Sequence, residues 1–101
     1  MTRESTIFRF DPSVSMFEVD STLHLARVAA SSLHGEDRIR QQAEARVDVE
    51  NSSCRIDTTR EAGQSLALIF GGYVRQEFGE KAVRVQRIAS TTKTPHQEIP
   101  T

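Results

Sequence analysis

Two periodicities alternate along the chain, and each predicts a kind of element. Apolar and polar residues alternate at 54–57 and over most of 82–88, and at 6–10 Phe8 and Phe10 fall on one face with Arg9 on the other, which is typical of half-buried β-strands. At 19–33 and 58–79 the apolar residues instead recur every three or four positions, which indicates amphipathic helices. The chain therefore combines strands with helices, and the second helix contains its longest apolar run.

Residues with known preferences for helix ends set the predicted limits of both helices. Asp20 or Ser21 is expected to cap the first helix, because a short side-chain oxygen accepts a hydrogen bond from an unpaired N–H of the first turn. Gly35 is expected to end that helix, since glycine readily adopts the left-handed conformation of a C-terminal cap. Thr58 and Glu61 have the spacing of a capping box at the start of the second helix.

The segment 39–50 carries two conflicting signals. Its arginine, glutamine, alanine and glutamate residues are good helix formers. Its even-numbered positions, however, are all polar, and its apolar residues fall on odd positions, which is the pattern of a strand. We predict a strand here, more firmly from Ala43 onward, and leave open whether 36–43 is strand or helix. Residues 51–53 then form a turn that joins this strand to the next as a hairpin.

The resulting order is β-α-β-β-α-β, which predicts an α+β fold. Split β-α-β units in this order form the ferredoxin-like superfold, an antiparallel four-stranded sheet with two helices on one face. Apolar strand residues, Val83 and Val85 among them, should then face the helices. We expect one domain at 6–88, a frayed N-terminus at 1–5, and a disordered tail at 89–101, which has two prolines and no periodicity.

The composition supports one folded domain and excludes several classes of function. The 101 residues are 37% hydrophobic and 27% charged, with a formal net charge of −1, so the chain has no general attraction for nucleic acid or an anionic membrane. The N-terminus lacks the apolar core of a signal peptide, and no run is long enough to span a membrane. The lone Cys54 cannot form an internal disulfide. We therefore expect a cytoplasmic protein with no membrane association and no cofactor.

The second helix contains a series of small residues. Gly63, Ala67 and Gly71 recur every four positions on one face, and Gly72 adds a third glycine. An interior glycine costs about 0.5–1 kcal/mol relative to alanine, so close approach of another backbone is the usual reason for it. The close neighbour is either the chain's own sheet or first helix, or a second subunit, which the outward-pointing Leu68 would favour. A hinge or a ligand contact is the remaining alternative.

Few polar residues are candidates for a ligand or catalytic site. Tyr73 is predicted within the apolar stripe as a core aromatic, and Glu77 follows it one turn later at the edge of the domain. His24 is expected in solvent near the start of the first helix. These three are the candidates for a site in a cleft between helix and sheet. No cluster of histidine, cysteine and acidic residues has metal-ligand spacing, so we predict no metal site.

The open face of the sheet offers another candidate surface. Arg38, Arg40, Arg46 and Arg55 could form a small basic strip that contacts nucleic acid. No exposed aromatic accompanies them for base stacking, and neighbouring acidic residues would repel phosphate, so we place this function third. The open face as a whole is predicted to carry charged residues: Arg9, Glu44, Arg46, Asp48, Arg55, Asp57 and Arg84.

Self-association is the interaction that the sequence favours most. The long second strand is expected to outrun its partner and leave an exposed edge, and such edges accept further strands. Together with the glycine-rich helix, this predicts a non-enzymatic binding or assembly module that forms a homodimer or binds a protein partner. A small enzyme or ligand binder is the first alternative, and a weak nucleic-acid binder is the second. The superfold does not decide between them, because it hosts many unrelated functions.

Overall fold

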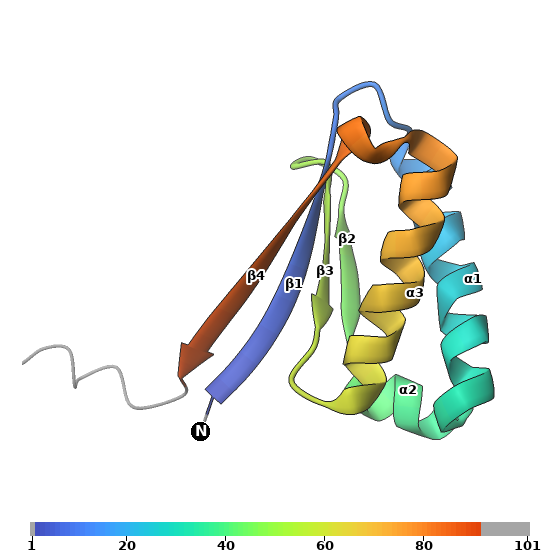
Figure 1. Cartoon of the computed structure of the whole chain (residues 1–101), viewed down its shortest axis with the longest axis vertical. Coiled ribbons are helices and arrows are strands. Elements are labelled where there is room, and N and C mark those ends of the chain that lie inside the picture. Colours follow the sequence, from blue (N-terminus) through green and yellow to red (C-terminus); the bar gives the residue numbers. More distant parts are fainter. Residues whose placement is uncertain (1, 92–101) are drawn as a thin grey trace, which may run out of the picture.

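The chain folds into a layer of strands and a layer of helices (Figure 1). The computed structural model describes residues 2–91. In order, the elements are β1 (Thr2–Phe10), α1 (Met16–His34), α2 (Glu36–Gln42), β2 (Ala45–Asp48), β3 (Ser53–Asp57), α3 (Glu61–Phe78), the 3-10 turn η1 (Glu80–Ala82) and β4 (Val83–Thr91).

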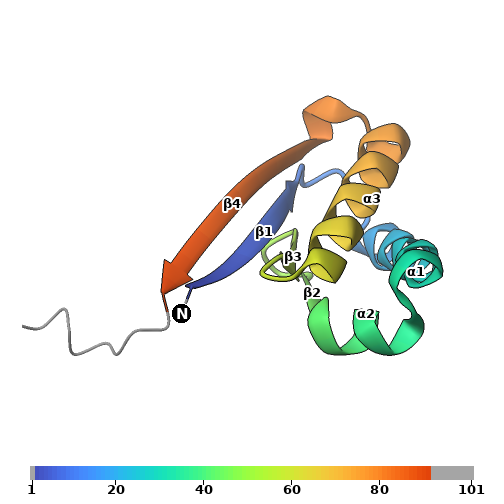
Figure 2. The same ribbon diagram turned by 60° about the horizontal axis from the view of Figure 1, so that its bottom comes forward.

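The four strands form one antiparallel sheet in the order β2-β3-β1-β4. β1 is central and pairs with β3 on one side and, over its whole length, with β4 on the other. The helices lie on one face of the sheet and leave the other face open, as Figures 1 and 2 show. An α+β fold with a four-stranded antiparallel sheet is thus confirmed. The described part of the chain has three α-helices, however, where two were predicted.

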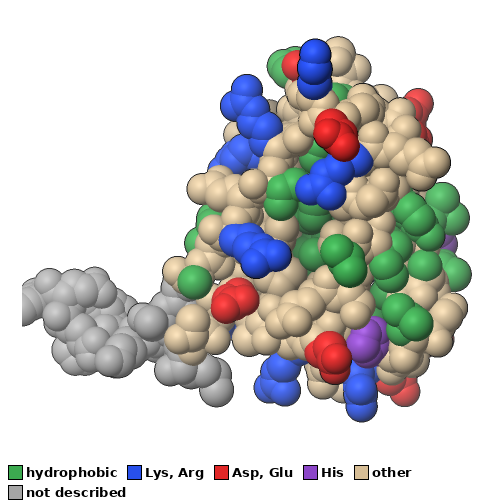
Figure 3. Space-filling model, viewed as in Figure 1, with side chains coloured by type: hydrophobic (Ala, Val, Ile, Leu, Met, Phe, Trp, Pro, Cys, Tyr) green, Lys and Arg blue, Asp and Glu red, His purple; other side chains and the backbone are tan. Residues whose placement is uncertain are grey.

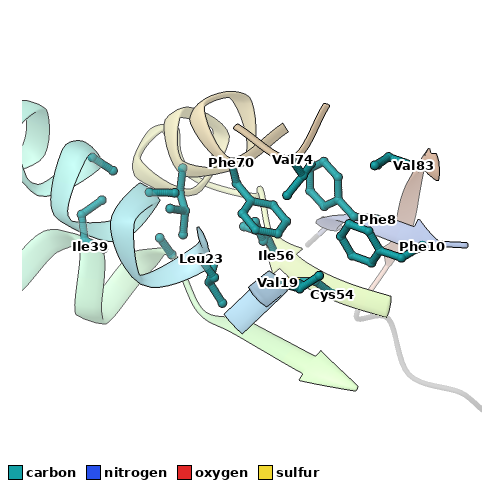
Figure 4. Close-up of a cluster of buried hydrophobic side chains, with 14 of the residues drawn as sticks. Phe8, Phe10, Val19, Leu23, Ile39, Cys54, Ile56, Phe70, Val74 and Val83 are labelled. Atoms are coloured by element: carbon teal, nitrogen blue, oxygen red, sulfur yellow. The ribbon is translucent and has the colours of Figure 1, made fainter. Parts of the chain in front are cut away.

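The hydrophobic core lies between the sheet and the helices α1 and α3 (Figure 4). Phe8 and Phe10 point from β1 toward Phe70 of α3, and the rings of Phe8 and Phe70 meet edge to face with their centroids 4.9 Å apart. Ile56 of β3 and Val19 of α1 are fully buried beside them. The alternation predicted for β1 and the apolar stripe predicted for α3 therefore both supply the core.

Of the segment 39–50, only Ala45–Asp48 is a strand, and the part left open as strand or helix is helical as far as Gln42. That helical part belongs to α2, and the strand is β2. The helix-forming composition decides the conformation here, and Arg40 adds ion pairs to two acidic residues one turn earlier. Ile39 is the one buried residue of α2, so the alternation of small and polar residues around it does not define a sheet face.

Gly35 ends α1 as predicted, with a φ of 91°, but the predicted N-terminal caps are not used. Asp20 and Ser21 lie inside α1, whose N-cap is Ser15, and neither α1 nor α3 has a side-chain hydrogen bond at its N-cap. α3 starts at Glu61, which is therefore the first helical residue rather than the third, so no capping box forms with Thr58. The side chain of Thr58 is instead buried against β1.

β1 and β4 are both longer than predicted. β1 starts at Thr2, within the segment 1–5 that was expected to fray, and β4 continues to Thr91, beyond the expected start of the tail at 89. The two strands support each other, because their register runs without interruption along the whole of β1. Residues 92–101, the rest of the predicted tail, lie outside the described residues.

Two apolar residues that were expected to face inward are exposed. Leu33 is the last residue of the apolar stripe predicted for 19–33, but it is 69% exposed because the buried stripe of α1 runs through Ala30 and on to His34. Val85 lies on the helix side of the sheet but is 41% exposed, because β4 diverges from α3 (Figure 2). This divergence opens the surface described next.

Candidate functional site

The small-residue face of α3 packs against the chain itself. A Cβ on Gly63 would overlap the backbone carbonyl oxygen of Asp57, and a Cβ on Gly71 would lie 3.3 Å from the ring of Phe8. Both glycines are buried within the chain. For these two positions the close neighbour is the chain's own sheet.

A groove of about 580 Å³ lies between α3 and the helix-side face of β4. Ala67 and Leu68 line its helix wall, Val85 lines its strand wall, and Phe8 and Gly71 border its base. Leu68 is 79% exposed, as its outward orientation predicted. In Figure 3 hydrophobic surface is visible between the strands and α3, and again over the outer helices. The polar lining of the groove includes Glu4, Thr58, Gln64, Arg75 and Arg87.

β4 is a nine-residue edge strand, and no described element pairs with its outer side. The hydrogen bond from Asp11 N to Ala82 O, 2.9 Å long, sets the phase of the ladder between β1 and β4. Because antiparallel bonds alternate along a strand, the backbone groups of even-numbered β4 residues face β1. The N–H and C=O groups of Val85 and Arg87 therefore face the free edge, whereas the N–H of Val83 donates to the carbonyl oxygen of Glu80 in η1.

The opposite edge strand, β2, is short and partly covered. It has four residues, and the carbonyl of Ala45 accepts a hydrogen bond of 3.1 Å from Arg27 Nη2 of α1. The long exposed edge predicted for the second strand is therefore wrong, because much of that segment is α2. The long exposed edge belongs to β4 instead.

Tyr73, Glu77 and His24 do not form a common site. Tyr73 is 39% exposed rather than in the core, because the buried stripe of α3 runs through Val74. Glu77 Oε1 accepts a hydrogen bond of 2.6 Å from the hydroxyl of Thr22, which links α3 to α1. His24 is exposed on α1. None of the three lines the groove, so the ligand site proposed for them has no structural support.

Besides Arg3 of β1, which pairs with Asp57 at 3.5 Å, the open face of the sheet carries one arginine from each strand. Arg46 of β2 is directly opposite Arg55 of β3, and Arg9 of β1 is directly opposite Arg84 of β4. All four residues are exposed. Like charges at directly opposed positions destabilise a sheet, so these two arginine pairs do not stabilise the fold.

The basic strip predicted from sequence is wrong in half of its members. Arg38 and Arg40 belong to α2 and not to the sheet. Arg9 and Arg84 were predicted on the open face but not as part of a binding site. Their proximity depends on the register between β1 and β4, which joins the two ends of the chain and leaves no local signal.

Cys54 is buried in β3 and plays no part in these surfaces. Burial raises the pKa of its thiol to about 12, so the group is protonated and unreactive at neutral pH. Within the described residues, no three histidine, cysteine or acidic side chains lie close enough together to hold a metal ion. None of the helices in that part of the chain is long and apolar enough to cross a membrane.

The chain matches no protein-family model, and no curated protein shows significant sequence similarity to it. We therefore infer the function from three features of the structure: the edge of β4, the groove beside it and the arginines of the open face.

Proposed function

We propose that the chain is a non-enzymatic assembly module that forms a homodimer through the free edge of β4. The observation that carries this proposal is the nine-residue edge strand, whose outer side no described element covers. Unpaired N–H and C=O groups along an edge are a template for another strand. Two copies related by a two-fold axis would satisfy these groups mutually in an antiparallel pair.

β4 lacks several features that normally protect an edge. Its sequence from 83 to 91 has no proline and no lysine, and its register with β1 shows no bulge. The contrast with β2 supports the proposal, because β2 is short and its carbonyl at Ala45 is covered by Arg27. The molecule therefore protects one edge of its sheet and leaves the other available.

The arginines of β4 favour some registers over others when two β4 strands pair antiparallel. If the two-fold axis passes through Gln86, Val85 lies opposite Arg87 of the second copy, and Arg84 lies opposite Ile88. A pair centred on Val85 places Arg84 opposite Gln86. Neither register sets one arginine directly against another, so both avoid the destabilisation that like charges cause across a sheet.

We also propose that the domain is a variant of the ferredoxin-like superfold with one added helix. β1 and β2 lie on either side of β3, and β3 and β4 lie on either side of β1, which is the interleaving expected of two split β-α-β units. α2 would then be an insertion between α1 and β2.

Proline at position 87 tests the dimer proposal. The N–H of Arg87 faces the free edge, so Arg87→Pro removes a donor from that edge without removing a bond to β1. We expect sedimentation velocity to show a concentration-dependent dimer for the unmodified chain and a monomer for Arg87→Pro.

Arg87→Ala is the matched control, because it removes the same side chain but keeps the backbone N–H. We expect this variant to dimerise like the unmodified chain. An unmodified chain that remains monomeric at high concentration would contradict the proposal, and so would a dimer that survives Arg87→Pro.

A further inference from the structure

We propose that the open face of the sheet binds single-stranded nucleic acid through a belt of four arginines. The arginine belt consists of Arg46, Arg55, Arg9 and Arg84, one from each strand in the order β2, β3, β1, β4. It lies on the face of the sheet and not at the β4 edge. The inference therefore does not depend on the homodimer proposal.

The strand register makes the belt continuous. Arg46 and Arg55 are directly opposite each other, as are Arg9 and Arg84. Arg55 is opposite Ile7, and Arg9 follows Ile7 by two residues on the same face, so Arg55 and Arg9 are diagonal neighbours. With strands spaced roughly 4.8 Å apart, the belt crosses about 14 Å of the sheet.

Most of the belt has no partner of opposite charge. Among the described residues, Arg46 pairs with Glu44 at 3.2 Å, which is the one ion pair that involves the belt. Arg9 Nε donates to a neutral glutamine of β4 at 3.4 Å. Arg55 and Arg84 have no carboxylate within ion-pair distance in that part of the chain. Three of the four arginines of the belt are therefore outside any ion pair among the described residues.

The acidic residues near the belt have other partners. Asp48, Asp57 and Asp11 each accept hydrogen bonds from residues two or three positions later in their own turns, at distances of 2.6–3.2 Å. These carboxylates hold the turns at the ends of the strands. Asp57 and Asp11 interact with the charges of Arg55 and Arg84 and so reduce the field of the belt, but they form no ion pair with these two arginines.

The chemistry of the belt fits phosphate and bases better than it fits a protein surface. A guanidinium group offers a planar fork of donors that matches a phosphate, and its plane can stack on an unpaired base. A protein interface needs an apolar centre. Within the belt the one apolar side chain is Ile7, which is itself half-buried.

The shape of the face favours a flexible strand over a small ligand or a duplex. The hollow beside Arg46 and Arg55 has a volume of about 250 Å³, below the size of a typical small-molecule pocket. The sheet is twisted, as Figure 2 shows. A single strand can follow a twisted surface and keep its phosphates near all four arginines, whereas a rigid duplex cannot.

Fluorescence anisotropy with a labelled mixed-sequence RNA of about twelve nucleotides tests the inference, since single-strand sites of this length are common. We expect binding at low salt that weakens as salt rises. Contacts to four phosphates predict a slope of about −2.8 in log K against log salt, at roughly −0.7 for each phosphate. The same RNA annealed into a duplex should bind more weakly.

The double variant Arg9→Gln/Arg55→Gln is expected to bind the RNA at least tenfold more weakly and with a shallower salt slope. The matched control is Arg38→Gln/Arg40→Gln, which removes the same charge from α2 and should bind almost like the unmodified chain, with at most a small loss. A thermal melt separates binding from folding. We expect Arg9→Gln/Arg55→Gln to melt close to the unmodified chain, because relief of the repulsion between opposed arginines offsets the lost attraction between Arg55 and Asp57.

Three results would overturn the inference. One is no binding of the RNA at low salt. Another is an equal loss of binding in the two double variants, which would show that total charge and not the belt is responsible. The third is duplex binding as tight as single-strand binding, or equal competition by polyglutamate, either of which would mean that the belt recognises negative charge in general.

Discussion

Gly63 and Gly72 lie in the same helix but have opposite structural roles. A Cβ at Gly63 would overlap the carbonyl oxygen of Asp57, whereas a Cβ at Gly72 would meet no atom of the described chain. The backbone of α3 can approach the end of β3 only because residue 63 has no side chain. Gly72 is exposed and gives the helix no such benefit.

Alanine substitutions at these two positions should therefore have opposite effects on stability. Gly63→Ala is expected to lower the free energy of unfolding by about 3 kcal/mol, because backbone must move to relieve the overlap. Gly72→Ala is expected to raise it by about 0.5–1 kcal/mol, the usual preference of a helix for alanine. Urea denaturation measures both values, and a tolerated Gly63→Ala would show that the close approach is not tight.

Asp57 links the stability of the chain to pH. Partial burial raises the pKa of its carboxyl, but hydrogen bonds from Thr59 and the charges of Arg3 and Arg55 outweigh burial and leave the pKa below the ordinary value of 3.8. A lowered folded-state pKa stabilises the fold at every pH above the ordinary value. This stabilisation is lost as the pH falls through the lowered pKa.

Asp57→Asn should therefore destabilise the chain near neutral pH and have a smaller effect in acid. Denaturation curves recorded from neutral pH down to about pH 2.5 would show the two proteins converging in stability. A constant difference between them over this range would mean that ionisation of Asp57 does not stabilise the fold.

At the scale of elements, local pattern predicts most of the structure where a single signal dominates. β1, β3 and α3 were predicted because alternation or helical periodicity agreed there with composition. The segment 39–50 failed because composition and alternation disagreed, and few of its residues are buried enough for alternation to matter. The ends of β1 and β4 were missed because polar residues can pair as strands through backbone alone.

The candidate surfaces depend on strand order, which local pattern does not contain. The sequence located an exposed edge on the second strand, but packing placed the long edge on β4, the last strand of the chain. Arg46 and Arg55 could be paired from their hairpin. Arg9 and Arg84 could not, because 74 positions separate them and only the register of β1 with β4 makes them neighbours.

At the scale of the whole molecule, the sheet has one face covered by helices, one open face and one long edge, that of β4, with which no described element pairs. Gly63 and Gly71, two of the small residues that suggested a subunit contact, pack inside the chain, so the case for self-association now rests on β4. The proposed contact also leaves the arginine belt exposed in both copies. Dimerisation and nucleic-acid binding are therefore separate properties that separate variants can remove.

Amide hydrogen exchange along β4, resolved by residue, tests the proposed dimer most directly. The N–H groups of Arg84, Gln86 and Ile88 face β1 and should be protected at every protein concentration. Those of Val85 and Arg87 face the free edge, and we predict fast exchange in dilute solution and slower exchange as the concentration rises. Fast exchange of Val85 and Arg87 at all concentrations would contradict the account.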